Sequence, residues 1–159
     1  MNEEITISTS IMAVEAAVVE SVRKILPIAR ATLQQQGTHL PTAILHTLEG
    51  LLPIVLPFKD DEQKRALVAY VKRQAIERHA FAVTVVTCAR VVDSRANDEE
   101  EALVLATSVQ GGAPYSVTQR FWRNDDRSVS RFGEVVEGEE AAVPGQMMIL
   151  PDWSEEVRH

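Results

Sequence analysis

The residues best suited to chemistry are one histidine and one cysteine, each inside a predicted strand. His46 follows Ile44 and Leu45, and a histidine on a sheet can act as a base or a metal ligand. Cys88 is the single cysteine, and Arg90 is expected on the same strand face, where its charge would favour the thiolate. The plainer interpretation of His46 is a half-buried or solvent-facing strand residue. The plainer interpretation of Cys88 is a small buried residue, since free cysteine is among the most buried residue types. A small hydrolase-like or ligand-binding site near His46 and Cys88 is kept as an alternative.

Metal and cofactor sites have no recognisable pattern in this sequence. His39 and His79 are expected at the ends of elements, and with His46 and Cys88 they show no spacing typical of zinc ligands. Phosphate-binding glycine loops, the dinucleotide fingerprint and the common hydrolase motifs do not occur. We therefore expect no metal and no cofactor. The missing motifs favour a non-enzymatic role, with an enzyme kept as the alternative.

Arginine and aromatic residues are concentrated around a predicted turn near position 125. The interaction candidates are Arg120, Phe121, Trp122, Arg123, Arg127 and Arg131. Protein interfaces and single-strand nucleic-acid platforms both combine these residue types. The net charge of −7 argues against nucleic acid. An interface predicts exposed apolar or aromatic residues near Phe121 and Trp122 and self-association through a sheet edge. The alternative is a hairpin with one face on the core and the other solvated.

Acidic residues form two runs. Asp98–Glu101 is interpreted as a solvated loop, because it lacks the spaced ligands of a cation-binding loop. The second run contains Glu137, Glu139 and Glu140 and opens a C-terminal segment that is acidic and polar. We predict that residues 137–159 are loose and dispensable for folding. The alternative function is an acidic inhibitor that binds a basic partner through these three glutamates.

Length and composition indicate one domain with a core of its own. The chain has 159 residues, of which 45% are hydrophobic and 25% charged. Its acidic charge disfavours an anionic membrane surface. The acidic start, Met1–Glu4, lacks the basic and then apolar pattern of a signal peptide, and a lone cysteine allows no internal disulfide. We expect a cytoplasmic location.

Hydrophobic periodicity predicts two helices and a run of strands. Apolar residues at steps of three and four indicate a helix that starts at Ser10 and is interrupted by Pro27. Asp60 and Gln63 have the spacing of a capping box at the start of the second helix. The predicted strands are 42–48, 51–57, 80–93, 101–109 and 115–123, with weaker ones at 128–136 and 147–150.

These elements predict an α+β fold. Its order is α-β-β-α-β-β-β, with a mainly antiparallel sheet of about five strands and both helices packed on one face. A crossover through the second helix predicts the spatial strand order 2-1-3-4-5. Residues 10–136 form the expected domain, after a frayed segment at 1–9.

The sequence of the predicted strands resembles a family of small uncharacterised domains from bacteria and phages. The resemblance covers about residues 41–123 and is carried by Pro41–Leu45, Pro57, Val83–Val92 and Glu101–Val104. The family's Glu-Ala-Trp-like stretch is replaced here by Thr87–Arg90, and the resemblance implies no activity for any residue. Taken together, the sequence favours a non-enzymatic protein-interaction or structural module, with a protein partner or a homodimer.

Overall fold

The computed structural model describes residues 3–91, 100–111 and 114–138, with side chains from Glu15 onward except at 90–91 and 100. The described residues form two helices and six strands. They are α1 (Glu3–Gln36), β1 (Thr42–Thr47), β2 (Gly50–Val55), α2 (Asp61–Glu77), β3 (Ala82–Val91), β4 (Glu100–Val109), β5 (Tyr115–Arg123) and β6 (Val129–Gly138). The predicted α+β class is confirmed, and β6 extends the expected five-stranded sheet to six strands. The weaker strand predicted at 147–150 lies outside the described residues.

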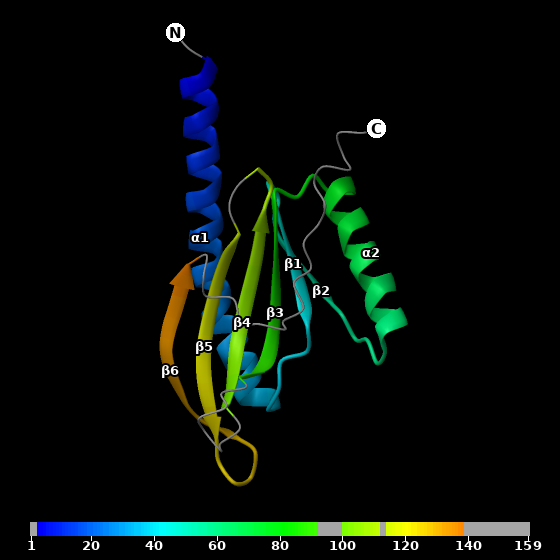
Figure 1. Ribbon diagram of the computed structural model, residues 1–159, viewed down its shortest axis with the longest axis vertical. Helices are drawn as coiled ribbons and strands as arrows, with labels where there is room; N and C mark the ends of the chain where they lie inside the picture. The colour runs from blue at the N-terminus through cyan, green and yellow to red at the C-terminus, as the bar shows by residue number, and fades with distance from the viewer. Residues whose placement is uncertain (1–2, 92–99, 112–113, 139–159) are drawn as a thin grey trace.

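All six strands form one antiparallel sheet, in the order β2-β1-β3-β4-β5-β6. The predicted order of the first five strands is therefore confirmed. Gly50, at a φ of 131° that favours glycine, ends the tight turn of the β1–β2 hairpin. Pro53 cannot donate to a strand ladder, and β2 lies on the sheet edge as predicted. Figure 1 shows α2 carrying the chain from β2 back to β3, which pairs with the inner side of β1.

The helices cover opposite faces of the sheet, so their predicted placement on one face is wrong. On β3, Ala82 and Val86 belong to the core under α1, whereas Val83 and Val85 pack with Val71 and other residues of α2. Alternate strand residues point to opposite faces. Because β3 is apolar on both sides, each side needs its own cover, and a single helical layer would leave Val83 and Val85 in water.

Helix α1 is longer than predicted and extends past the sheet. It begins at Glu3 rather than Ser10 and runs through Pro27 to Gln36 as one helix. The stripe that packs on the sheet contains Val18, Val22, Ile25, Leu26, Ala29 and Leu33. Figure 1 shows the N-terminal half of α1 extending beyond the end of the sheet. Within the described residues, no helix is long and apolar enough to cross a membrane.

The predicted cap of α2 is confirmed and allows a direct test. The Asp60 carboxylate accepts a 2.8 Å hydrogen bond from the Gln63 amide, and the Gln63 side chain accepts one from the Lys59 amide, also at 2.8 Å. Replacing Asp60 with Ala should lower the free energy of unfolding by about 1 kcal/mol, because a helix-end amide loses its partner. Asp60→Asn, which keeps an acceptor, should stay near the wild type in urea unfolding. Equal losses in the two variants would contradict a capping role.

Candidate functional site

The β5–β6 hairpin separates the predicted arginine and aromatic cluster onto two faces. Phe121 is only 1% exposed and packs in the core under α1, with its ring centroid 6.3 Å from that of Phe132. Phe121, one of the sequence candidates for an interface, is therefore a core residue. Trp122, the next residue, points to the opposite face and is half-buried. Strand alternation causes the separation, since neighbouring residues cannot share one face of a sheet.

Arg123 makes structural contacts within the chain. Its guanidinium pairs with the Glu101 carboxylate of β4, and the two side chains are only 12% and 19% exposed. Its Nη1 donates to the backbone carbonyls of Gly37 and Arg127, each at 2.8 Å. Arg123 therefore joins the end of α1, strand β4 and the β5–β6 turn. We call this set the Arg123 clamp.

Three of the six candidates share the sheet face opposite α1. We call Arg120, Trp122 and Arg131 the Trp122 patch. The Arg131 guanidinium lies 4.2 Å from the Trp122 ring, a cation–π geometry. Gly133 also borders that ring, because a Cβ at this position would lie 3.0 Å from a Trp122 ring carbon. Arg127 is an exposed residue of the turn and contributes its carbonyl to the Arg123 clamp.

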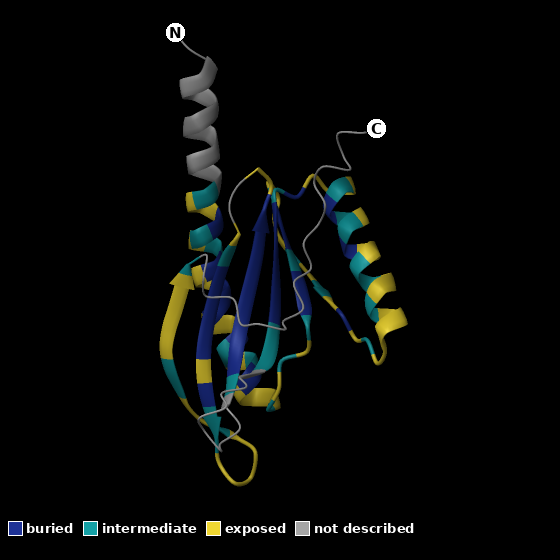
Figure 2. Ribbon diagram, viewed as in Figure 1, coloured by how far each residue is buried: buried dark blue, intermediate teal, exposed yellow. Residues whose placement is uncertain are grey.

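Strand β6 is the open edge beside this patch. β5 pairs with one side of β6, and within the described residues no strand pairs with the other. Val135 and Val136 are 39% and 53% exposed, although both are apolar. Figure 2 shows exposed positions along most of β6, in contrast to the buried strands beside it. An edge with unpaired backbone groups and apolar side chains can accept another strand.

The outer end of β6 is braced against α1. Arg23 pairs with Glu137 at 3.0 Å, and this hydrogen bond lowers the pKa of Glu137. Burial raises the pKa of the neighbouring Tyr115 hydroxyl. Glu137, one of the three glutamates considered for a basic partner, is thus already paired within the chain. Glu139 and Glu140 lie outside the described residues, as do Asp98 and Glu99.

His46 is a buried member of a polar chain. It is 1% exposed, and its Nε2 lies 2.7 Å from Thr84 Oγ1, which lies 2.8 Å from Thr107 Oγ1. These bonds link β1, β3 and β4. Burial lowers the pKa of His46 to about 4, so the ring is neutral at pH 7. Its Nδ1 has no hydrogen-bond partner among the described residues.

Cys88 lies apart from His46. His46 pairs with Ala82, six residues before Cys88 on β3, which corresponds to about 20 Å along the strand. Burial raises the pKa of the Cys88 thiol, which disfavours the nucleophilic thiolate. The structure therefore does not bring these two sequence candidates together. Among the described residues, no three His, Cys, Asp or Glu side chains are grouped to hold a metal ion.

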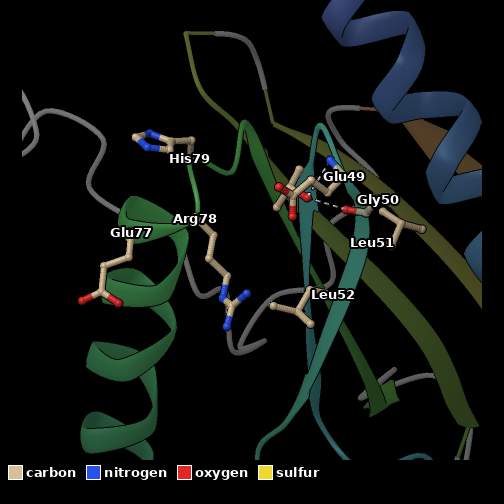
Figure 3. Close-up of a pocket in the computed structure, with 8 residues that line it drawn as sticks. Glu49, Gly50, Leu51, Leu52, Glu77, Arg78 and His79 are labelled. Carbon is tan, nitrogen blue, oxygen red and sulfur yellow. Dashed lines mark hydrogen bonds between the residues drawn. The ribbon is translucent and has the colours of Figure 1, made fainter.

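A surface hollow of about 430 Å³ lies between the β1–β2 hairpin and the end of α2. Its lining residues are Thr47, Glu49, Gly50, Leu51, Leu52, Glu77, Arg78 and His79. Figure 3 shows Glu77 and His79 pointing away from the hairpin. Arg78 Nε donates to the Gln74 side chain at 3.0 Å, so its position is fixed by α2. An acid–base or nucleophilic site requires polar groups that converge on one point, and the polar groups of this hollow do not.

Known proteins offer no guide to function. A scan against protein-family models and searches of curated proteins and of solved structures found no match to this chain. The sequence also did not predict the contact partners that determine the structural role of most candidate residues, such as Glu101 and Gly37 for Arg123. These pairings join distant parts of the chain and leave no local signal. The strongest remaining candidate is the open β6 edge with the adjoining Trp122 patch.

The Arg123 clamp predicts a large loss of stability from one substitution. Arg123→Ala leaves the Glu101 carboxylate and two backbone carbonyls without their donor, and it should lower the free energy of unfolding by about 3 kcal/mol. The matched control is Arg131→Ala, which removes an exposed arginine of the same hairpin and should cost under about 1 kcal/mol. Urea unfolding measures both. Similar losses would show that Arg123 has no special structural role.

Burial of His46 predicts acid sensitivity. Its folded pKa of about 4 lies below the ordinary 6.5, so folding favours the neutral ring. The stabilising contribution is complete above pH 6.5 and is lost as pH falls toward 4, by about 3 kcal/mol. His46→Gln should flatten the dependence of unfolding free energy on pH in that window. His79→Asn, at an exposed left-handed position that asparagine tolerates, should keep the wild-type slope. Identical slopes in all three proteins would contradict this prediction.

Proposed function

We propose that this protein is a non-enzymatic interaction module that pairs with a second copy of itself through β6. The observation that carries the proposal is the exposed, ten-residue edge strand with Val135 and Val136 in solvent. Antiparallel pairing of two β6 strands would use the same surface on both copies, as two-fold dimers do. The result would be one continuous sheet through both molecules.

Support comes from the contrast between the two edges. β2 has six residues and includes Pro53, which interrupts the row of backbone donors that a new strand needs. β6 has ten residues and no proline. On β6, Val135 and Val136 point to opposite faces, so each face of a paired edge would gain an apolar contact. The Trp122 patch lies beside this edge and would add a stacked arginine and tryptophan to the contact.

The net charge and the single cysteine suit a protein partner in the cytoplasm. A net charge of −7 disfavours nucleic acid, and the half-buried thiol of Cys88 needs no oxidising compartment. Two of the described residues that could do chemistry are already engaged: His46 in the polar chain and Glu137 with Arg23. The exposed apolar edge of β6 therefore fits a partner that presents a strand edge better than it fits a small substrate.

Two exposed-edge variants test the proposal. Val135→Lys with Val136→Lys should give a monomer of 17.6 kDa, because two charges cannot be buried at a strand pair. The matched control is Val55→Lys on the opposite edge, where Val55 is 51% exposed. This control should keep the wild-type mass of twice one chain. Sedimentation equilibrium at tens of micromolar protein gives the masses, and circular dichroism checks that each protein is folded.

The outcomes separate the two edges. A wild type that stays monomeric would refute self-association. A dimer that survives both β6 substitutions but dissociates with Val55→Lys would place the interface on β2. If every protein remains a dimer, the interface lies elsewhere, and pairing through β6 is refuted.

A further inference from the structure

One face of the β1–β2 hairpin is apolar and open to solvent. On β2, Leu52 and Ile54 pack with α2. Alternate strand residues point to opposite faces, so Leu51, Pro53 and Val55 lie on the other face, which α1 covers farther along the sheet. All three are exposed, Leu51 by 43% and Val55 by 51%. A contiguous group of exposed apolar residues is typical of an interaction surface.

Helix α1 borders this open face and presents an apolar residue to it. Ile28 is 68% exposed. Arg23 of the same helix faces β6, where it pairs with Glu137. At about 3.6 residues per turn, Arg23 and Ile28 lie on opposite flanks of the buried stripe that contains Ile25 and Ala29. Figure 1 shows β1 and β2 at the edge of the sheet opposite β6, so Ile28 is on the flank of α1 nearest the hairpin.

We call Ile28, Leu51, Pro53 and Val55 the hairpin face. Beside it, Ile44 of β1 pairs with Pro53 and packs partly with the core under α1. Of the described residues that pack with this core, none comes from β2. Strand β2 is therefore covered by a helix on the α2 side and left open on the α1 side.

The size of the hairpin face fits a single helix better than a second copy of the chain. A stable dimer uses about 20–30 residues on each side, whereas this face offers its four exposed apolar residues and the half-buried Ile44. A helix that binds in a groove uses only about three or four anchors in one stripe. Addition of a strand is disfavoured, because Pro53 interrupts the backbone donors of the β2 edge.

The spacing of the exposed residues also matches a helix. Leu51, Pro53 and Val55 follow one another at about 6.6 Å along β2. Helix residues three or four positions apart share one side and are separated by about 4.5–6 Å along the axis. Successive anchors of one helix can therefore contact successive residues of β2. The same helix would lie beside α1 at about 8–10 Å, the usual distance of packed helices, and contact Ile28.

We propose that the hairpin face binds a partner protein through one amphipathic helix whose polar side is basic. Charge favours a basic helix over an acidic one, because the chain carries −7 and Glu49 is exposed at the hairpin turn. Lys24, on the adjoining part of α1, is already paired with Glu20 at 3.5 Å. The hairpin lies at the edge of the sheet opposite β6, so this site is separate from the proposed self-association and does not depend on it.

The test uses the full chain and three fluorescent peptides of about 18 residues. The first contains leucine, alanine and lysine, with leucines at i, i+3, i+4 and i+7 in one stripe. The second has the same composition, with its leucines distributed around the helix. The third has glutamate in place of every lysine of the first. Fluorescence anisotropy should show that the first peptide binds at least about tenfold more tightly than either of the others.

Neutral substitutions locate the site on the protein. Leu51→Thr with Val55→Thr should weaken binding of the first peptide about tenfold, and Ile28→Gln should do the same, because each removes anchor contacts. The matched control, Val135→Thr with Val136→Thr, removes the exposed valines of β6 and should stay within about twofold of the wild type. All these positions are exposed, so urea unfolding should show little change in stability.

Three results would overturn the inference. The first is equal affinity for the striped peptide and either of the other two. The second is binding that Leu51→Thr with Val55→Thr leaves unchanged. The third is an equal loss in the β6 control, which would place the peptide on β6. The readout is peptide affinity and not the mass of the protein, so its failure is distinguishable from a failure of pairing through β6.

Discussion

The central strands β3 and β4 carry apolar side chains on both faces, and this constraint organises the rest of the fold. Val86 and Leu103 require a cover on one side, and Val83 and Val104 require one on the other. Helix α1 covers the first side along β3, β4 and β5. Helix α2 covers the second side over β1 and β3.

The same constraint explains why exposure is concentrated at β6. The apolar residues of α1 pack on the sheet as far as Phe121 and Phe132. On the opposite face, no described helix packs over β6. The strand is held by hydrogen bonds to β5, by the Arg23–Glu137 pair and by partial packing of Val129 and Phe132 on the core. A strand held in this way keeps one row of backbone groups unpaired. This is the property that the proposed interaction uses.

Local signals in the sequence predicted local structure well. The Asp60 and Gln63 spacing correctly predicted the start of α2, and Pro53 correctly placed β2 at an edge. Residues 80–93 were correctly predicted as a strand, which the structure places at Ala82–Val91 with apolar residues on both faces. A strand with apolar residues on both faces needs a packed layer on each face. The prediction of two helices on one face did not take this into account.

Pairings between distant residues could not be predicted in the same way. The arginine and aromatic cluster suggested a surface because its residue types are common at interfaces. Whether Arg123 faces solvent depends on Glu101 and Gly37, which are 22 and 86 residues away. The burial of His46 likewise depends on Thr84, which is 38 residues away. Residue type and spacing alone carry no information about such contacts.

Amide hydrogen exchange at low and high protein concentration tests the central claim most directly. If two copies pair through β6, amides of residues 133–138 should exchange more slowly in the concentrated sample, while amides of β2 exchange at the same rate in both. Equal exchange of β6 at the two concentrations, in samples that sedimentation shows to differ in mass, would contradict pairing through this edge.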